Sequence, residues 1–266
     1  MSRSPDLVEG KVGADDRPIS TAGIHLEKGR YRARQAVTPA DVEAAQRMRH
    51  RAFKGGTEGI DADAYDARCL HILIETRETG ALVACFRLLP LARGDQIDRS
   101  YSAQFYELSA LADFNGPLVE MGRFCIAPEA RDPDIQRVAW GALTAYVDEA
   151  GIELLFGCAS FAGTDETAYL DAFAALKARH LAPPRWLPRI KAPKIFPFAR
   201  KLARVPDMRE AMRRMPPLLK TYLAMGGWVS DHAVIDEEMN TLHVFTGVEI
   251  GRIPPARKRA LRAAAG

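Results

Sequence analysis

The stretch PLVEMGRFCIAP, residues 117–128, predicts a strand that carries two opposite charges. Turn-forming glycine and proline residues bound it on both sides, and the residues between them, 118–126, are mostly apolar. Glu120 and Arg123 interrupt that apolar run, although an interior strand seldom keeps ionised groups unless they are paired or used. Their spacing of three puts them on opposite faces of a regular strand, whereas a β-bulge between them would bring them closer.

Outward from this strand, the hydrophobic periodicity predicts alternating helices and strands. The best-marked helix covers residues 38–53, where Thr38 is the N-cap, Pro39 takes the first helical position and Asp41 follows three residues after the cap. Further strands are predicted at residues 30–37, 70–76, 81–90, 154–160, 228–235 and 242–250, and further helices at 102–111, 134–151, 165–179 and 216–226. This order indicates one mixed α/β domain over residues 29–266, with an insertion at about residues 182–215 and a flexible polar segment at residues 1–28.

The composition is that of an ordinary globular protein. Of the 266 residues, 47% are hydrophobic and 27% are charged, and the uncharged apolar runs are shorter than the roughly 20 residues that span a bilayer. The N-terminus has no apolar signal-like stretch, so we expect a cytoplasmic protein. The four cysteines are widely spaced without a C-x-x-C pair, which predicts buried, reduced thiols and no metal site.

Several chemistries have no support in the sequence. It contains neither G-x-G-x-x-G nor G-x-x-x-x-G-K, so no dinucleotide or P-loop site is predicted. Ser160 lies in GCASFAG, which is not a nucleophile elbow, and the histidines are scattered. A covalent nucleophile mechanism is therefore not expected.

Other charged residues break the apolar pattern in a definite order. Arg49 and Phe53 share one face of the first helix, Asp63 and Asp66 precede a strand, and Arg87 lies near the end of the next. Each of these charges alone is explained by a structural salt bridge or a solvated edge.

In combination, however, the order resembles the acyl-homoserine lactone synthases and, over nearly the whole chain, the ornithine lipid synthases. The resemblance lies in RHRAF, DAYDARCLHILIE, LVACFRLLP, VEMGRFCIAP and LLFGCAS, and in the later PPLLKTYLAMGGWV and HAVIDEEMNTLHVF. The lactone synthases resemble only the first half of the chain. The resemblance implies a GNAT-like acyltransferase fold, with a central mixed, mostly antiparallel sheet flanked by helices and a basic helical insertion.

The resemblance also implies a reaction, in which the α-amine of ornithine attacks the thioester of a 3-hydroxyacyl carrier protein and lyso-ornithine lipid forms. An amine needs no enzyme nucleophile, only loss of its proton and a place for the oxyanion. Glu120 is then suited to be the general base, and Arg123 to orient Glu120 or a substrate carboxylate. The residues expected to bind substrate are Arg49, Phe53, Asp63, Asp66, Arg87 and Arg123. No tightly bound cofactor is implied, because acyl-phosphopantetheine on the carrier protein is a co-substrate.

The turn after the charged strand bears on the acyl donor. Acetyl-CoA enzymes of the GNAT class have a glycine-rich turn there, whose N–H groups hold the pyrophosphate. Here that turn reads APEARDPDIQR and contains no glycine. A carrier-protein arm has no pyrophosphate, so the missing glycines favour that donor over free CoA.

The insertion is strongly basic. Between Arg185 and Arg214 there are ten Lys or Arg and two acidic residues, a local charge of +8, while the remaining chain carries −5 out of the total of +3. Trp186, Phe196 and Phe198 accompany these charges, which favours an acidic carrier protein or an anionic inner-membrane surface over nucleic acid. The candidate docking residues are Arg131, Arg189, Lys191, Lys194, Arg200, Lys201 and Arg204, and a peripheral position on the cytoplasmic face of the inner membrane is expected. A solvated loop without a partner is the alternative.

Three alternatives to the ornithine reaction stay open. The same fold could acylate glutamine, because nothing local names the pocket that reads the acceptor side chain. A lactone synthase fits the later segments less well. A protein of another functional class is the third alternative. It would be a non-catalytic, membrane-associated module that binds acyl carrier protein, in which the same motifs serve only to pack the core.

Overall fold

Within residues 23–265, which the computed structural model describes, ten strands form one sheet and two short strands form a second. The strands are β1 His25–Lys28, β2 Tyr31–Gln35, β3 Leu70–Thr76, β4 Leu82–Leu91, β5 Tyr106–Glu107, β6 Leu118–Ile126, β7 Leu154–Ala162, β8 Arg189–Ile190, β9 Ile195–Phe196, β10 Trp228–Val229, β11 Ala233–Asp236 and β12 Thr241–Glu249. The helices are α1 Pro39–Phe53, α2 Pro133–Glu149, α3 Leu170–Arg179, α4 Phe198–Lys201, α5 Met208–Arg214, α6 Pro217–Ala224 and α7 Pro255–Ala265.

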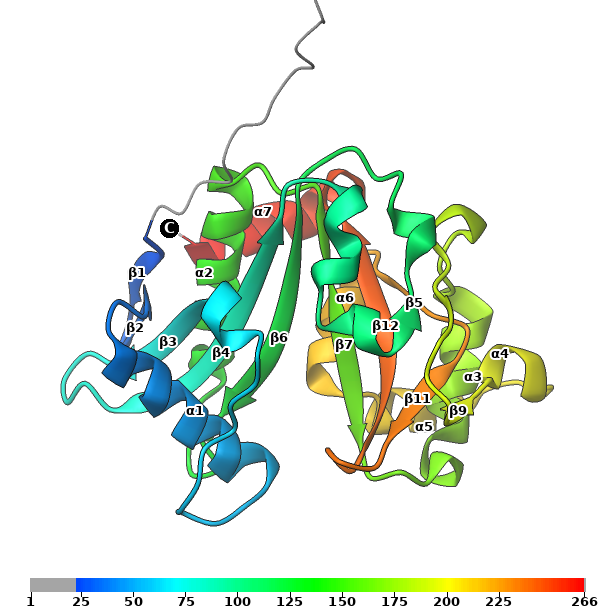
Figure 1. The fold of residues 1–266 in the computed structure, drawn as a ribbon, viewed down its shortest axis with the longest axis horizontal. Helices are drawn as coiled ribbons and strands as arrows, with labels where there is room; N and C mark the ends of the chain where they lie inside the picture. The colour runs from blue at the N-terminus through cyan, green and yellow to red at the C-terminus, as the bar shows by residue number, and fades with distance from the viewer. Residues whose placement is uncertain (1–22, 266) are drawn as a thin grey trace, which may run out of the picture.

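The large sheet has the order β1-β2-β3-β4-β6-β7-β12-β11-β9, with β10 also paired to β12. Its pairs are antiparallel except β6 and β7, which run parallel and pair only over residues 118–120 and 154–156. Beyond that point the two ribbons diverge (Figure 1). A Cβ at Gly157 would lie 2.4 Å from the Met121 carbonyl oxygen, so the backbones meet closely just where they begin to part. The facing edges of β6 and β7 are left without strand partners after the divergence.

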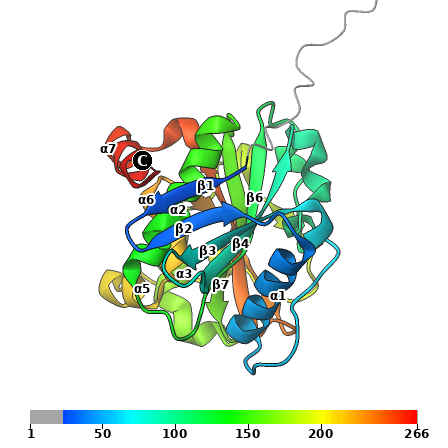
Figure 2. The ribbon, with the colours of Figure 1, turned by 90° about the vertical axis from the view of Figure 1, so that its left-hand side faces the viewer.

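Two layers cover the faces of the sheet. Helices α2, α3 and α6 pack on one face around a large apolar cluster, and α7 packs against α2. On the other face α1 covers β3, β4 and β6, and the segment of residues 94–117 covers the centre. The two views together place α1 on the opposite side of the sheet from α2 and α7 (Figures 1 and 2). The charged strand β6 is therefore central and sits beside the divergence.

Most of the predicted elements are confirmed, including the mixed, mostly antiparallel sheet flanked by helices. Helix α1 begins with the expected capping box, in which Thr38 and Asp41 satisfy each other's backbone N–H groups. Strand β6 has a β-bulge that begins at Arg123, since two β6 residues lie opposite one β4 residue there and Arg123 has a φ of +54°. No helix in residues 23–265 combines the length and apolarity needed to cross a bilayer.

Four expectations are wrong. Residues 102–111 form short 3-10 turns and β5 instead of a helix, because Tyr106 is fully buried and its hydroxyl is hydrogen-bonded to His243 of β12. The strand expected at 228–235 is interrupted, since the Ser230 hydroxyl accepts the N–H of Phe245 and ends β10. The insertion contains strands β8 and β9 besides the short helices α4 and α5. In the segment expected to be flexible, residues 25–28 form β1 through pairing with β2, and residues 1–22 lie outside the described residues.

The close approach at the divergence generates a stability prediction. Because Gly157→Ala would force the Met121 carbonyl away, we expect the free energy of unfolding to fall by about 1–3 kcal/mol, as measured by urea denaturation. Gly251→Ala is the matched control, since its added Cβ meets nothing within 4 Å, and should change stability by less than about 0.5 kcal/mol. Equal stability of the two variants would contradict a tight approach of β6 and β7.

Candidate active site

A cavity of 530 Å³ opens where β6 and β7 diverge. It is lined by β6 and β7 residues on two sides, by the end of α1 and the start of α6, and by the β11–β12 hairpin; its ionisable lining residues are Arg87, Tyr101, Glu120, Arg123, Cys158, Asp236 and His243. Charged and apolar groups thus meet in one space between the central strands.

Glu120 reaches this cavity from β6 and is held there by the start of the segment 94–117. Its two carboxylate oxygens accept the backbone N–H groups of Tyr101 and Ser102, both at 2.7 Å, and one also accepts the Ser102 hydroxyl at 2.5 Å. Burial raises the pKa of Glu120, although these three hydrogen bonds act in the opposite direction. A buried, fixed carboxyl group with a raised pKa is suited to take up a proton.

Arg123 lies on the bulge and points away from Glu120. Its Nε is 3.0 Å from Asp61, one of its terminal nitrogens is 3.3 Å from Asp63, and its guanidinium carbon lies 4.9 Å from the centre of the Tyr101 ring. No hydrogen bond or ion pair joins it to Glu120 among the described residues. The expectation that Arg123 orients Glu120 is therefore wrong, because the left-handed backbone at the bulge turns its side chain toward the aspartates.

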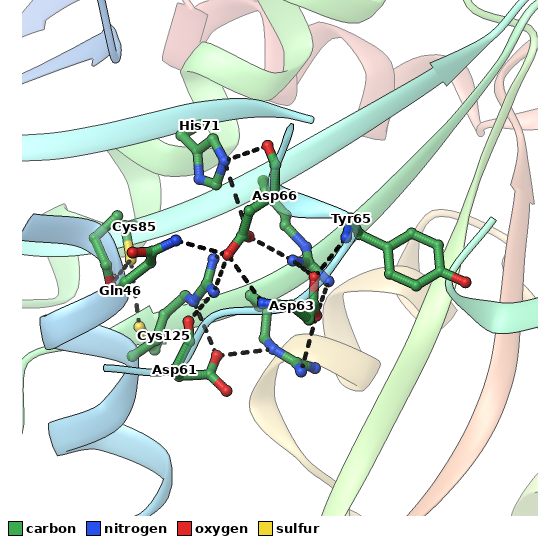
Figure 3. A network of polar contacts seen from close by, with 12 residues as sticks. Gln46, Asp61, Asp63, Tyr65, Asp66, His71, Cys85 and Cys125 are labelled. Carbon is green, nitrogen blue, oxygen red and sulfur yellow. Dashed lines mark hydrogen bonds and ion pairs between the residues drawn. The ribbon is translucent and has the colours of Figure 1, made fainter. Parts of the chain in front are cut away.

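At the cavity wall and behind it, three arginines and three aspartates form one network (Figure 3). Arg49, only 1% exposed, makes two bonds to Asp66, at 2.8 and 2.9 Å, and one to Asp61, at 2.9 Å. Arg87 makes a matching pair of bonds to Asp63, at 2.7 and 2.8 Å, and one to Asp66, at 2.6 Å. Gln46 and His71 complete the contacts of Asp66. The network, which includes Arg123, is balanced at three charges of each sign.

The network also sets the protonation of its carboxylates. Burial acts to raise the pKa of Asp66, but the hydrogen bonds and charge of Arg49, with Gln46 and Arg87, lower it overall. The pKa of Asp63 is likewise lowered, since Arg87 outweighs burial. These groups therefore stay ionised and paired at neutral pH.

Three further lining groups, Cys158, His243 and Tyr101, are neutral at physiological pH. Burial raises the pKa of Cys158 to about 12 and lowers that of His243 to about 4. Burial also raises the pKa of Tyr101. Cys158 is thus a thiol, not a nucleophilic thiolate, which agrees with the absence of a covalent-nucleophile motif.

The predicted substrate residues divide into two groups. Phe53, Arg87 and Arg123 line the cavity together with Glu120, whereas Arg49, Asp63 and Asp66 lie behind it. The expectation that these last three fill the polar end of the pocket is wrong, because ion pairing draws them into the network.

Sequence reasoning missed five residues of the site and its surroundings. Asp61 had a signal, since it begins the same DADAYD run that drew attention to Asp63 and Asp66. Tyr101 and Ser102 bind Glu120 mainly through their backbone N–H groups, which no side-chain pattern marks. Asp236 and His243 lie in a quoted motif, but only the pairing of strand β11 with β12 and of β12 with β7 brings them to the cavity.

The basic insertion is largely neutralised by acids from elsewhere in the chain. Its ion pairs are Arg185–Glu249, Arg189–Glu107, Lys194–Glu237 and Arg204–Asp171, and Arg213 and Arg214 both pair with Glu210. Lys191 donates to the Ala103 carbonyl at 2.7 Å. Of the candidate docking residues, Arg131, Lys191, Arg200 and Lys201 make no ion pair within residues 23–265, and the last two and Arg131 make no hydrogen bond there through their side chains either. The local charge of +8 therefore overstates the free positive charge.

The aromatic residues of the insertion are also engaged. Phe196 and Phe198 are 5% and 0% exposed and pack on Phe173 of α3, while Trp186 is half-buried against Phe114. Phe196 and Phe198 are therefore core residues and cannot support membrane binding by the insertion, as their presence beside its charges had suggested.

Comparison with known proteins identifies relatives of this chain. A family profile described as "Acetyltransferase (GNAT) domain" matches residues 45–141. An L-ornithine N(alpha)-acyltransferase from Rhodobacter capsulatus is 33% identical over 81% of this chain and 88% of its own length. Another from Brucella abortus is 32% identical over 85% of this chain and 86% of its own length. The solved structure of an N-acyl amino acid synthase from uncultured soil microbes is 14% identical, covering 89% of this chain and 97% of that one with a TM-score of 0.46.

The charge network generates a prediction about stability. Asp66→Asn would leave Arg49 and Arg87 short of a buried counter-charge, so we expect the free energy of unfolding to fall by about 3–5 kcal/mol at pH 7. Because the pKa of Asp66 is lower in the folded state than in the unfolded state, the difference from wild type should shrink as the pH falls below about 4. Urea denaturation at several pH values measures both effects.

The control for Asp66→Asn is Glu43→Gln, which breaks an exposed ion pair with Arg47 on α1. It should cost less than about 0.5 kcal/mol. A loss for Asp66→Asn as small as this would mean that the network is not held by charge.

Proposed function

The chain belongs to the family of L-ornithine N(alpha)-acyltransferases and is an acyltransferase with a GNAT-like fold, and we propose that it acylates the α-amine of L-ornithine. The donor is a 3-hydroxyacyl chain on acyl carrier protein, and the product is lyso-ornithine lipid. The observation that carries the proposal is Glu120, a fixed carboxyl group of raised pKa at the head of a cavity between two diverging strands.

In this proposal Glu120 is the general base. Amino acids carry their α-amine as an ammonium ion at neutral pH, so attack on a thioester first requires loss of a proton, which Glu120 accepts directly or through a water. The nitrogen then attacks the thioester carbonyl and a C–N bond forms. As the C–S bond breaks, the nitrogen loses a second proton, which ends on the departing sulfur, while the proton first taken by Glu120 is released to solvent. Three hydrogen bonds keep the Glu120 carboxylate in place throughout.

The diverging strands suit the donor arm. Phosphopantetheine is an extended chain with two amides, and the edges of β6 and β7 that face each other past residues 120 and 156 have no strand partner. Their backbone N–H and C=O groups are available to pair with those amides, as an added strand would. Backbone N–H groups on these edges are also the nearest candidates for stabilising the thioester oxyanion.

The start of α2 supports a carrier-protein donor over free CoA. Asp132 caps this helix and accepts the N–H of Asp134 at 2.9 Å, while Arg30 and Tyr31 contact the same carboxylate. An acidic side chain thus already occupies the N-terminus of α2 and accepts one of its free N–H groups, which disfavours binding of a pyrophosphate there.

Acyl carrier protein is the partner that the free cations suit best. Carrier proteins are acidic, and Arg131, Arg200 and Lys201 are exposed cations without an ion pair among the described residues. The aromatic contribution to membrane binding is lost with the burial of Phe196 and Phe198, and a peripheral membrane position stays a prediction.

The experiment that tests the function is mass spectrometry of the purified protein with 3-hydroxyacyl carrier protein and a panel of amino acids. An N-acylornithine product supports the proposal. Acylation of glutamine in preference to ornithine would replace ornithine as the acceptor, and absence of any amide would favour a carrier-protein-binding module without catalysis.

The role of Glu120 generates a kinetic prediction. Glu120→Gln keeps the shape but removes the base, so kcat should fall by about 10²- to 10⁴-fold with unchanged folding. Raising the pH should partly restore the rate, because more of the amine is then free without help. Glu153→Gln, an exposed carboxylate outside the cavity, is the control and should behave as wild type. A near-normal rate of Glu120→Gln at neutral pH would make Glu120 a structural charge.

The donor assignment generates a second prediction. Because the turn before α2 has no glycine and its helix is capped by Asp132, kcat/KM should be far higher with an acyl carrier protein than with the same acyl group on CoA. Steady-state kinetics with the two donors measures this preference. Comparable values would refute the donor assignment.

A further inference from the structure

Among the charged residues that line the cavity, Asp236 has the fewest partners within residues 23–265. The other three are engaged, since Arg87 pairs with Asp63 and Asp66, Arg123 pairs with Asp61, and Glu120 is held by three donors. Asp236 makes no ion pair within residues 23–265. Its only polar contact there is between Oδ1 and the backbone N–H of Met239, at 3.0 Å.

The sheet places Asp236 on the same side as the other cavity residues. It is the last residue of β11 and lies opposite Thr241, which in turn lies opposite Ala162 of β7. Directly opposed residues of antiparallel strands share a face, and both of these partners line the cavity. Asp236 is therefore at the end of the cavity formed by the β11–β12 hairpin, and Glu120 enters it from the other side, on β6.

The groups near Asp236 do not neutralise it. His243, Tyr101 and Cys158 line the same cavity as Asp236. Each of these is uncharged at physiological pH. The buried network of arginines and aspartates is balanced, so the charges of the cavity that remain uncompensated are both negative, on Glu120 and Asp236.

A cavity of this charge is complementary to a basic amino acid. Ornithine carries two ammonium groups and one carboxylate, whereas glutamine carries one of each and has a neutral side chain. A half-buried carboxylate without a cation is costly, and a substrate ammonium would remove that cost. The α-amine is consumed at Glu120, which leaves the side-chain ammonium for Asp236.

We propose that Asp236 binds the side-chain ammonium of the acceptor and thereby selects a basic amino acid over a neutral one. This inference rests on the proposed function and assigns the part of the site that reads the acceptor side chain. Arg123, which lies on the same strand as Glu120 and also lines the cavity, is then the candidate partner of the α-carboxylate.

A role of Asp236 in the hairpin turn alone does not account for these observations. Turn formation uses Oδ1, which accepts the Met239 N–H, and the turn is completed by Asn240 in a left-handed conformation with φ +50°. Oδ2 receives no hydrogen bond from any described residue. Asparagine at position 236 keeps the oxygen that the turn needs and removes the charge, so it separates the two roles.

The test compares acceptors that differ only in the side-chain charge. Wild-type protein and Asp236→Asn are assayed with acyl carrier protein as donor and with ornithine, norvaline or glutamine as acceptor. Norvaline has the carbon chain of ornithine without the side-chain amine. For Asp236→Asn we expect kcat/KM with ornithine to fall about 10²-fold, mainly through KM, while the neutral acceptors change little.

The matched control is Glu237→Gln. Glu237 is the neighbouring carboxylate but points outward and pairs with Lys194 on the surface. This variant should keep the wild-type preference for ornithine, and the melting temperature of both variants should match that of wild type.

Ornithine binding without donor, measured by calorimetry, separates failure of this inference from failure of the proposed function. If wild type binds ornithine, Asp236→Asn does not, and no amide forms, the assignment of Asp236 stands and the acyl transfer fails. If Asp236→Asn keeps the wild-type preference for ornithine over norvaline, the inference is overturned and the acyltransferase reaction is unaffected. If wild type neither binds nor acylates ornithine, both are overturned.

Discussion

The pairing of three arginines with three aspartates at one wall of the cavity is the interaction on which the site depends. Arg49 comes from α1, Arg87 from β4 and Arg123 from β6, and the loop before β3 supplies all three carboxylates. The network therefore ties one helix and two central strands to a single loop. Such charges would be costly to bury singly, and mutual pairing with near-complete hydrogen bonding offsets that cost. It also explains how an arginine at the bulge can hold a left-handed backbone, since its side chain is fixed at the far end.

A second constraint is the point at which β6 and β7 part. Up to Glu120 and Phe156 the sheet is continuous and its core is dense, whereas beyond these residues the edges of β6 and β7 face a cavity. Glu120 is the last β6 residue that still pairs with β7, so its backbone is held rigidly in the sheet while its side chain reaches the cavity. The segment of residues 94–117 completes this arrangement by directing two N–H groups at its carboxylate. A base positioned in this way needs little reorganisation when a proton is transferred.

The charged groups of the site are thus of two kinds, those whose charge is neutralised by other residues and those whose charge is not. Charges in the network are neutralised within the protein, and they shape the wall without adding net charge to the cavity. Glu120 and Asp236 are not neutralised by arginines, and they stand on opposite sides of the space in which an amino acid with two amines would lie. In the proposed reaction, one of the two removes a proton while the other reads the identity of the side chain. The basic insertion likewise has less free positive charge than its composition indicates, because acids elsewhere in the chain neutralise most of it.

The sequence by itself determined the local features of this protein. The periodicity of residues 118–126, the capping box at Thr38 and Asp41, and the presence of unexplained charges in strands were all legible, because each depends on neighbours within a few positions. The tertiary structure decided which charges are satisfied and which are free. The residue types of Arg49, Asp63 and Asp66 do not show whether these side chains pair in a buried network or line a pocket. The strand order decides this, and it places the three residues behind the cavity wall. Asp236 meets the cavity because β11 pairs with β12, and β12 with β7, contacts between residues that lie far apart in the chain. Spacing along a strand determines the face on which a side chain lies, but pairing between distant strands determines what that face encloses.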